Sequence, residues 1–331
     1  MTPLEMRRLS YLLLPLIGLL LWLAVRDLNW REIVHSLRRL TPLQLLLLAA
    51  LNLLILLLNS ARWQILLRAQ GWRVPLQTVF GYRLAAFGVN YFTPGPQFGG
   101  EPLQVRLLQT RHHLPLPQAL AAVSLDKLLE LLVNFTFLAL GLIGIALSGL
   151  NPAQANLPLL PPILGLLALP GGYLLLLTRA ALPLTTLAQR WLIPARSARL
   201  QNLGRILISS ERSAAGLCTH APRQVAAALL VSLLGWGLLI LEYALTLRFL
   251  GAPLDALEII AALTAARLAF LAPTPGGLGA LEASQVWALG ALGVNPAIGL
   301  GAALLIRARD LLLGGLGLLW GARLLREKKS Q

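Results

Sequence analysis

The sequence predicts an all-α, polytopic integral membrane protein. Of its 331 residues, 57% are hydrophobic and only 12% are charged, whereas a soluble domain has about 25% charged residues. The stretch 43–58 holds one Gln and one Asn among apolar residues. Several such runs approach or exceed the roughly 18 to 20 residues that a helix needs to cross a bilayer. We therefore expect lipid to surround most of the chain.

Apolar segments predict the number of spans. We expect six full spans, at approximately 9–26, 42–61, 117–148, 157–178, 224–249 and 296–322. Two further apolar segments, at approximately 76–113 and 254–291, are interrupted in the middle by TPGPQFGGE (93–101) and PTPGGLGALE (273–282). Together they predict a single transmembrane domain over 1–331, with half-repeats at 9–148 and 157–322.

The distribution of arginine predicts the orientation, because basic loops stay on the cytoplasmic side. The stretch 179–223 holds seven Arg and one Glu, and the C-terminus is also basic, whereas 149–157 and 290–298 carry no charge. The basic segments 62–73 and 106–113 place both ends of the first interrupted segment in the cytoplasm. These assignments agree only if each interrupted segment is a re-entrant helical hairpin. Backbone that bends at membrane depth must be covered by protein or line a water-filled cavity.

The two interrupted segments resemble each other. Each contains Thr-Pro-Gly, and a glutamate (Glu101 or Glu282) follows the proline by seven residues. A charged residue inside an apolar span (Asp126 or Arg307) follows each glutamate by 25 residues. Three spans separate the hairpins, so the copies are expected to have opposite orientations. A pseudo-inverted repeat with paired interruptions indicates a transporter site near the membrane midplane.

Charged residues inside the spans are the candidate site, because a charge in the membrane core is costly and is usually paired or functional. Two interpretations of these charges are compatible with each other. The charges form ion pairs that hold helices together, or they line a polar cavity for the head group of an amphiphile. Lys127 with Glu130, and Arg307 with Asp310, are three residues apart and face each other on a helix. The candidate substrate-binding residues are Glu101, Arg106, Asp126, Lys127, Glu130, Arg267, Glu282, Arg307, Arg309 and Asp310.

Glycines at the two interruptions are expected to allow tight turns of the backbone. A helix that restarts near Gly100 or Gly279 would direct free N–H groups at an anion such as a phosphate. Arg83, Arg106 and Arg267 are candidate partners of the phosphate, or they snorkel to the interface. The candidate hairpin glycines are Gly95, Gly99, Gly100, Gly276, Gly277 and Gly279.

Several classes of function are disfavoured by the composition and motifs. The chain has a net charge of +15, and its basic residues lie beside apolar runs. We therefore expect membrane lipids, and no nucleic acid, as partners. We find no Walker loop, nucleophile elbow or metal-ligand spacing. We therefore expect no catalytic residue, metal or cofactor, and we expect that the protein is not an enzyme.

Two blocks of sequence resemble a known family. The stretch 99–130, GGEPLQVRLLQTRHHLPLPQALAAVSLDKLLE, is similar to the core of the lysylphosphatidylglycerol synthase transmembrane (flippase-like) family, and PTPGGLGALE resembles its second hallmark. The resemblance implies an inner-membrane protein that moves, or helps to move, lipids between leaflets. The distribution of basic residues predicts that both termini of this multi-pass chain are cytoplasmic. The chain departs from the best-known members because no soluble aminoacyl-transferase domain follows the last span, so we do not expect it to aminoacylate lipid.

The sequence therefore predicts a lipid flippase or transporter. We expect it to move an anionic or zwitterionic amphiphile, such as a phospholipid or another phosphate-bearing lipid, without ATP hydrolysis. Two alternatives remain open. One is a membrane-embedded lipid-modifying enzyme that uses Asp126 and Glu130 as acid and base. The other is an accessory scaffold for lipid, polyprenyl or hopanoid biosynthesis.

Overall fold

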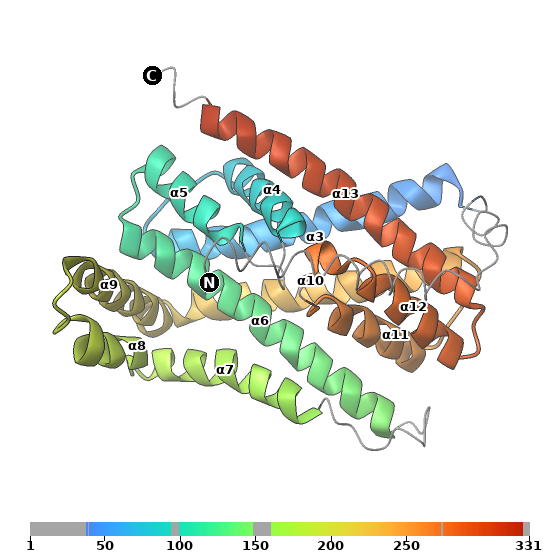
Figure 1. The fold of residues 1–331 in the computed structure, drawn as a ribbon. Helices are drawn as coiled ribbons and strands as arrows, with labels where there is room; N and C mark the ends of the chain where they lie inside the picture. Colours follow the sequence, from blue (N-terminus) through green and yellow to red (C-terminus); the bar gives the residue numbers. More distant parts are fainter. Residues whose placement is uncertain (1–37, 39, 94–98, 148–159, 273, 327–331) are drawn as a thin grey trace.

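The computed structural model describes residues 38, 40–93, 99–147, 160–272 and 274–326. Within these residues the chain forms helices joined by short connections, with no β strand (Figure 1). The predicted span at 9–26 and the glycine at position 95 lie outside the described residues. In chain order the helices are α3 (Pro42–Ala69), α4 (Leu76–Phe92), α5 (Glu101–His112), α6 (Leu116–Leu147), α7 (Leu160–Thr178), α8 (Pro183–Leu187), η2 (Ala188–Leu192), α9 (Ala198–His220), α10 (Pro222–Phe249), α11 (Ala256–Ala269), η3 (Pro275–Gly277), α12 (Ala280–Ala291) and α13 (Pro296–Arg326).

Four of the described helices, α3, α6, α7 and α10, are long and apolar enough to cross a membrane. At 28 residues, α3 and α10 extend for about 42 Å, which exceeds the roughly 30 Å of a bilayer core. The 31-residue α13 is also long enough but carries Arg307, Arg309 and Asp310 near its middle. The protein is thus an all-helical membrane protein.

The segment that follows the predicted span at 42–61 differs from the prediction. The sequence predicts a basic segment outside the span at 62–73, yet α3 continues to Ala69. Arg62 therefore lies inside this helix and is buried, with 2% of its surface exposed. A single cation does not end a helix when a carboxylate from a neighbouring helix can bind it.

Both interrupted segments fold as pairs of short helices. α4 and α5 have 17 and 12 residues, and α11 and α12 have 14 and 12. A capping box formed by Asp255 and Glu258 begins α11. Gly276 and Gly277 have positive φ angles of 53° and 69°, so the backbone turns sharply between α11 and α12 where glycine is favoured.

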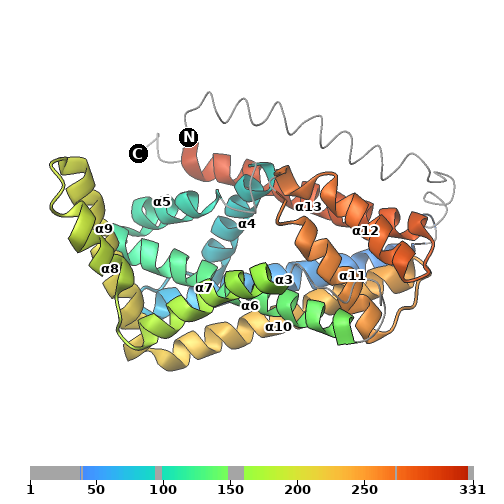
Figure 2. The ribbon, with the colours of Figure 1, turned by 60° about the horizontal axis from the view of Figure 1, so that its bottom comes forward.

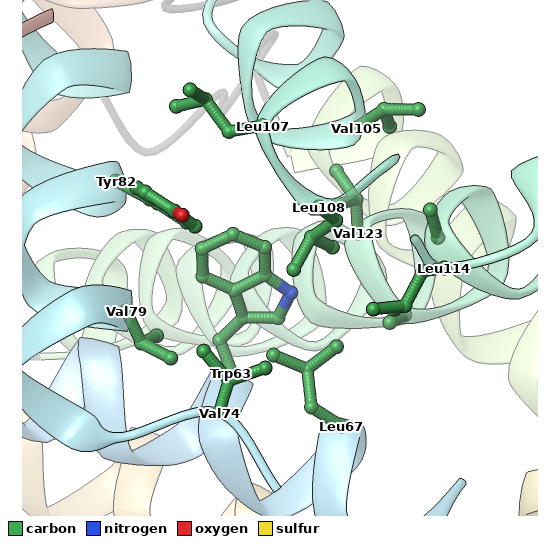
Figure 3. Packing of buried hydrophobic residues seen from close by; sticks show 12 residues of the cluster. Trp63, Leu67, Val74, Val79, Tyr82, Val105, Leu107, Leu108, Leu114 and Val123 are labelled. Atoms are coloured by element: carbon green, nitrogen blue, oxygen red, sulfur yellow. The ribbon is translucent and has the colours of Figure 1, made fainter. Parts of the chain in front are cut away.

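Each pair of short helices packs in its own apolar cluster. Trp63 of α3 lies at the centre of the first cluster, fully buried among side chains from α3 to α6 (Figure 3). Tyr243 and Leu247 of α10 belong to the second, which contains residues of α11, α12 and α13.

The crossing of α4 and α13 brings the two parts of the chain together. Gly88 and Gly317 lie where the backbones meet, and a Cβ atom added at Gly88 would approach the Gly314 carbonyl oxygen to 2.6 Å. Small residues permit this close approach of helices, as is common in membranes. The first interrupted segment is therefore held directly against the last helix.

Candidate functional site

A cavity of about 640 Å³ opens inside the helical bundle, with walls from α3, α4, α5, α6, α7, α10, α11, η3 and α13. Seven of the ten predicted substrate-binding residues line it: Glu101, Asp126, Lys127, Glu130, Arg267, Arg309 and Asp310. Arg62, Arg83 and Asn90 also contribute to its walls. The cavity thus combines several charged groups with apolar surface inside a membrane protein.

Asp126 is the centre of the first group of charges. Arg62 of α3 donates to it from Nε at 2.7 Å and from Nη2 at 3.2 Å, and Arg83 of α4 donates from Nη2 at 2.6 Å. Such charge-assisted, two-point contacts are the strong class of hydrogen bonds. These two ion pairs, which share Asp126, connect three helices, α3, α4 and α6.

Lys127 extends this group toward the first interruption. Its Nζ donates to Glu130 at 2.9 Å, which confirms the predicted pairing, and lies 3.4 Å from Glu101. Glu130 also accepts from Arg62 at 3.3 Å. The group holds three cations and three carboxylates, so its formal charge is zero.

A second group of charges lies where α3, α10 and α13 meet. Arg309 donates to Asp310 at 2.8 Å and to Asn52 at 3.0 Å, and it lies 3.5 Å from Glu242. Asn52 in turn donates to Glu242 at 3.2 Å. One cation and two carboxylates give this group a formal charge of −1.

Arg307 and Glu282 form a third pair just outside the cavity lining. Arg307 donates to Glu282 from Nε at 2.7 Å and from Nη2 at 3.2 Å, and both residues are buried. Its Nη1 also donates to Tyr91 and to the Gly276 carbonyl. The predicted pairing of Arg307 with Asp310 is therefore wrong, because α12 presents a carboxylate closer to the guanidinium.

Arg267 of α11 differs from the other cations of the cavity. Its guanidinium carbon lies 5.0 Å from the ring centroid of Trp236 and 5.9 Å from that of Phe270. Among the described residues it makes no hydrogen bond or ion pair with a carboxylate. Stacking on aromatic rings leaves the edge of a guanidinium free to bind an anion in a forked geometry.

The predicted anion site at the helix starts is occupied by the protein itself. The Gly99 N–H donates to Glu101 and the Gly279 N–H donates to Glu282, both at 2.9 Å. Carboxylates satisfy free donors at a helix N-terminus as a phosphate would. A phosphate at these two N–H groups would have to displace the glutamates.

The remaining predicted residue, Arg106, is exposed and does not line the cavity. Conversely, three lining residues were missed or undervalued. The sequence places Arg62 in the basic segment that follows a span, and Asn52 and Trp236 carry no periodic signal, because polar or aromatic residues occur singly in many spans. Asn52 lies ten positions before Arg62 on the same helix, about 80° away around the helix axis, so helical spacing alone does not group the two.

Comparison with known proteins assigns the chain to a family of membrane proteins. The family model described as "Lysylphosphatidylglycerol synthase TM region" matches residues 9–317. The chain belongs to this family. Within the lysylphosphatidylglycerol synthase transmembrane family, the block at 99–130 corresponds here to α5 and the start of α6, and Pro275–Glu282 to η3 and the start of α12. The first of the two blocks that carry the resemblance therefore supplies Glu101, Asp126, Lys127 and Glu130. The second block supplies Glu282.

A curated relative of this family member is a "UPF0104 membrane protein" from Methanothermobacter thermautotrophicus (strain ATCC 29096 / DSM 1053 / JCM 10044 / NBRC 100330 / Delta H). The two are 34% identical over 117 residues, which is 35% of this chain. The match covers 34% of the relative's length. The family and this relative agree that the protein resides in a membrane, and the family description gives it a lipid-related context.

Proposed function

We propose that this protein moves a lipid with an anionic or zwitterionic, phosphate-bearing head group between the leaflets of the inner membrane without ATP hydrolysis. The observation that carries the proposal is Arg267, a cation without a carboxylate partner among the described residues, which faces a cavity whose other charges are paired. A phosphate is a suitable ligand because its oxygens match the fork of a guanidinium. The apolar part of the lining suits the start of the acyl chains.

We also propose that α4–α5 and α11–α12 are the two re-entrant hairpins of a pseudo-inverted repeat. A helix of 12 residues extends for about 18 Å, too short for a core of about 30 Å. Single cysteines at Gln77 and His113 would test the first hairpin, with the native Cys218 replaced by alanine. A membrane-impermeant maleimide should label both positions from the same side, and labelling from opposite sides would contradict the hairpin.

The paired charges suggest how the cavity remains open. An unpaired charge inside the membrane is costly and favours a collapsed, covered site. Charges that are paired between helices can line a water-filled cavity within the membrane. In our proposal the head group binds at Arg267 while the acyl chains stay in lipid, and the hairpins alternate access to the two sides with both termini in the cytoplasm. Movement of the hairpins would change the contact of Tyr91 with Arg307.

The enzyme alternative has weaker support. Both oxygens of Asp126 accept from guanidinium groups, so neither is free to take a proton from a substrate as a general base must. Glu130 is likewise bound by Arg62 and Lys127. We therefore propose transport, not chemical modification, and mass spectrometry of lipids incubated with the purified protein tests this choice.

The central experiment is leaflet exchange in proteoliposomes. Fluorescent phospholipid should become accessible to an impermeant reductant faster with the native protein than in empty vesicles. Arg267→Gln should slow exchange about tenfold, the effect of losing roughly 1.4 kcal/mol of head-group binding. Arg106→Gln is the matched control, because it removes the same charge at an exposed position outside the cavity, and it should leave exchange unchanged.

A neutral lipid separates recognition from folding. If Arg267 binds phosphate, Arg267→Gln should slow the leaflet exchange of a labelled phospholipid but leave the exchange of a labelled diacylglycerol unchanged. If the exchange of both lipids slowed equally, Arg267 would have a structural role and would not recognise the head group. Native exchange no faster than in empty vesicles would reject the transport proposal itself.

A further inference from the structure

A basic hairpin, defined as α8, η2 and α9 (183–220), lies at one end of the helical bundle. α9 crosses the ends of the long helices at a steep angle in Figure 2, and Figure 1 also places it at that end. Its C-terminal half packs on the bundle through Ala214, Leu217 and Cys218. Its N-terminal half instead packs on η2, where Gly204 lies close to Leu192 and Ile193.

Large apolar side chains remain exposed on both arms of the basic hairpin. Trp191 is 68% exposed, Leu187 54% and Leu203 46%. Leu184, Ile193 and Leu200 are exposed as well. An apolar set of this size on a helical hairpin indicates a surface that contacts lipid or another protein.

The exposed charge of the basic hairpin is entirely positive. All of its arginines are exposed: Arg190, Arg196, Arg199, Arg205 and Arg212. Its one acidic residue, Glu211, is buried and accepts from the Tyr173 hydroxyl and the Leu184 N–H, both at 2.9 Å, and from the Thr185 N–H. The carboxylate is used inside the fold, so it does not balance the arginines at the surface.

On α9, Arg205 lies on the side opposite the leucines, whereas Arg199 borders the leucine face, about 40° from Leu203. At 3.6 residues per turn, Leu200 and Leu203 lie about 60° apart, whereas Arg205 lies about 160° from Leu203. On the other arm, Arg190 lies over the ring of Trp191, 5.8 Å from its centroid. Tryptophan with arginine is the combination that anchors helices at the boundary between head groups and acyl chains.

We propose that the basic hairpin lies in the membrane interface and binds the surface of anionic phospholipids. Its leucines and Trp191 enter the upper acyl region, and its arginines contact phosphates. A second copy of the chain would suit this surface less, because two identical basic faces would bring arginine against arginine. The proposal goes beyond the expectation that the basic stretch 179–223 is cytoplasmic, and it holds whether or not the cavity transports lipid.

The test uses a fluorescent label on single cysteines in a Cys218→Ala background, at Leu203→Cys and, as the matched control, at Arg205→Cys. The full-length variants are reconstituted in vesicles of phosphatidylcholine alone or mixed with phosphatidylglycerol. In the mixed vesicles, nitroxide lipids should quench the label at position 203 and aqueous iodide should quench the label at position 205. In phosphatidylcholine alone, the shielding at position 203 should decrease.

A second pair of variants tests the charges. Arg190→Gln and Arg199→Gln, each made alone, should weaken the preference for spin-labelled phosphatidylglycerol over phosphatidylcholine by about fivefold. Arg190→Lys and Arg199→Lys, which keep the charge, should restore it. Size-exclusion profiles like the native one show that the variants are folded.

Three outcomes would overturn the proposal. Equal access of iodide to positions 203 and 205 in both vesicle types would make the basic hairpin a solvated loop. Shielding of position 203 from both quenchers, together with cross-linked dimers, would assign the surface to a second copy. If the label at position 203 were equally shielded in the two vesicle types, the basic hairpin would not need anionic lipid in order to bind the membrane.

Discussion

Glu101 and Glu282 hold related places in two separate pairs of helices. Each carboxylate accepts the N–H of a glycine that precedes its helix, Gly99 or Gly279, at 2.9 Å. Each also pairs with a cation of the next long helix: Lys127 at 3.4 Å for Glu101 and Arg307 at 2.7 Å for Glu282. The two glutamates differ in burial, because the Glu101 side chain is 22% exposed and that of Glu282 is 6% exposed.

This difference predicts unequal effects of the same substitution. Glu282→Gln should destabilise the protein by about 3 kcal/mol, because it leaves the buried Arg307 without an anionic partner. Glu101→Gln should cost less, since Glu130 still binds Lys127 near water. Thermal unfolding in detergent measures both, and a larger loss for Glu101→Gln would contradict the burial argument.

The carboxylate of Asp126 should be the more critical of two buried aspartates. Asp126→Asn changes its group of charges from neutral to +1 and leaves Arg62 partly unpaired, at a cost of about 3 kcal/mol. Asp310→Asn, its control, changes the second group from −1 to neutral while Glu242 and Asn52 still contact Arg309. The unfolding temperature should fall much further for the first variant, and equal decreases would show that the charge balance is unimportant.

The crossing of α4 and α13 should tolerate no added methyl group. A Cβ atom at Gly317 would collide with the carbonyl oxygen of Leu84, whereas one at Gly315 has nothing within 4 Å. Gly317→Ala should therefore cost about 1 to 3 kcal/mol. Gly315→Ala, on the same helix, should be neutral or slightly stabilising, because alanine favours helix. Comparable stability of the two variants would mean that the helices cross less closely.

Cys218 should react slowly although it is the only cysteine of the chain. Burial raises the pKa of its thiol from 9.0 to about 11. Only the thiolate reacts, so at pH 8 the reactive fraction is about 100-fold lower than for an ordinary thiol. The rate should rise with pH up to about 11.

Maleimide labelling followed by mass spectrometry measures this rate. Thr219→Cys in a Cys218→Ala background is the matched control, because position 219 is exposed. It should be labelled far faster than the native cysteine at pH 8. Similar rates would show that the packing of α9 on α6 and α7 opens readily.

The sequence predicted much of the site because charges in apolar helices are conspicuous. Asp126, Lys127 and Arg309 stand out in long apolar runs, and they do line the cavity. Arg62 was misassigned because it follows an apolar run, where a cation is typical of a span end. Its burial depends on Asp126, which is 64 positions away in the chain. No local pattern indicates such a contact.

Hydropathy, proline and glycine are local properties, so the sequence by itself determined the membrane class, the apolar helices among the described residues and the two interruptions. The tertiary structure decided which charges meet. It paired Arg307 with Glu282 instead of Asp310, placed Arg106 outside the cavity and left Arg267 stacked on Trp236. The physical reason is that an ion pair depends on the distance between side chains of separate helices, and helix periodicity specifies only the face on which each side chain lies.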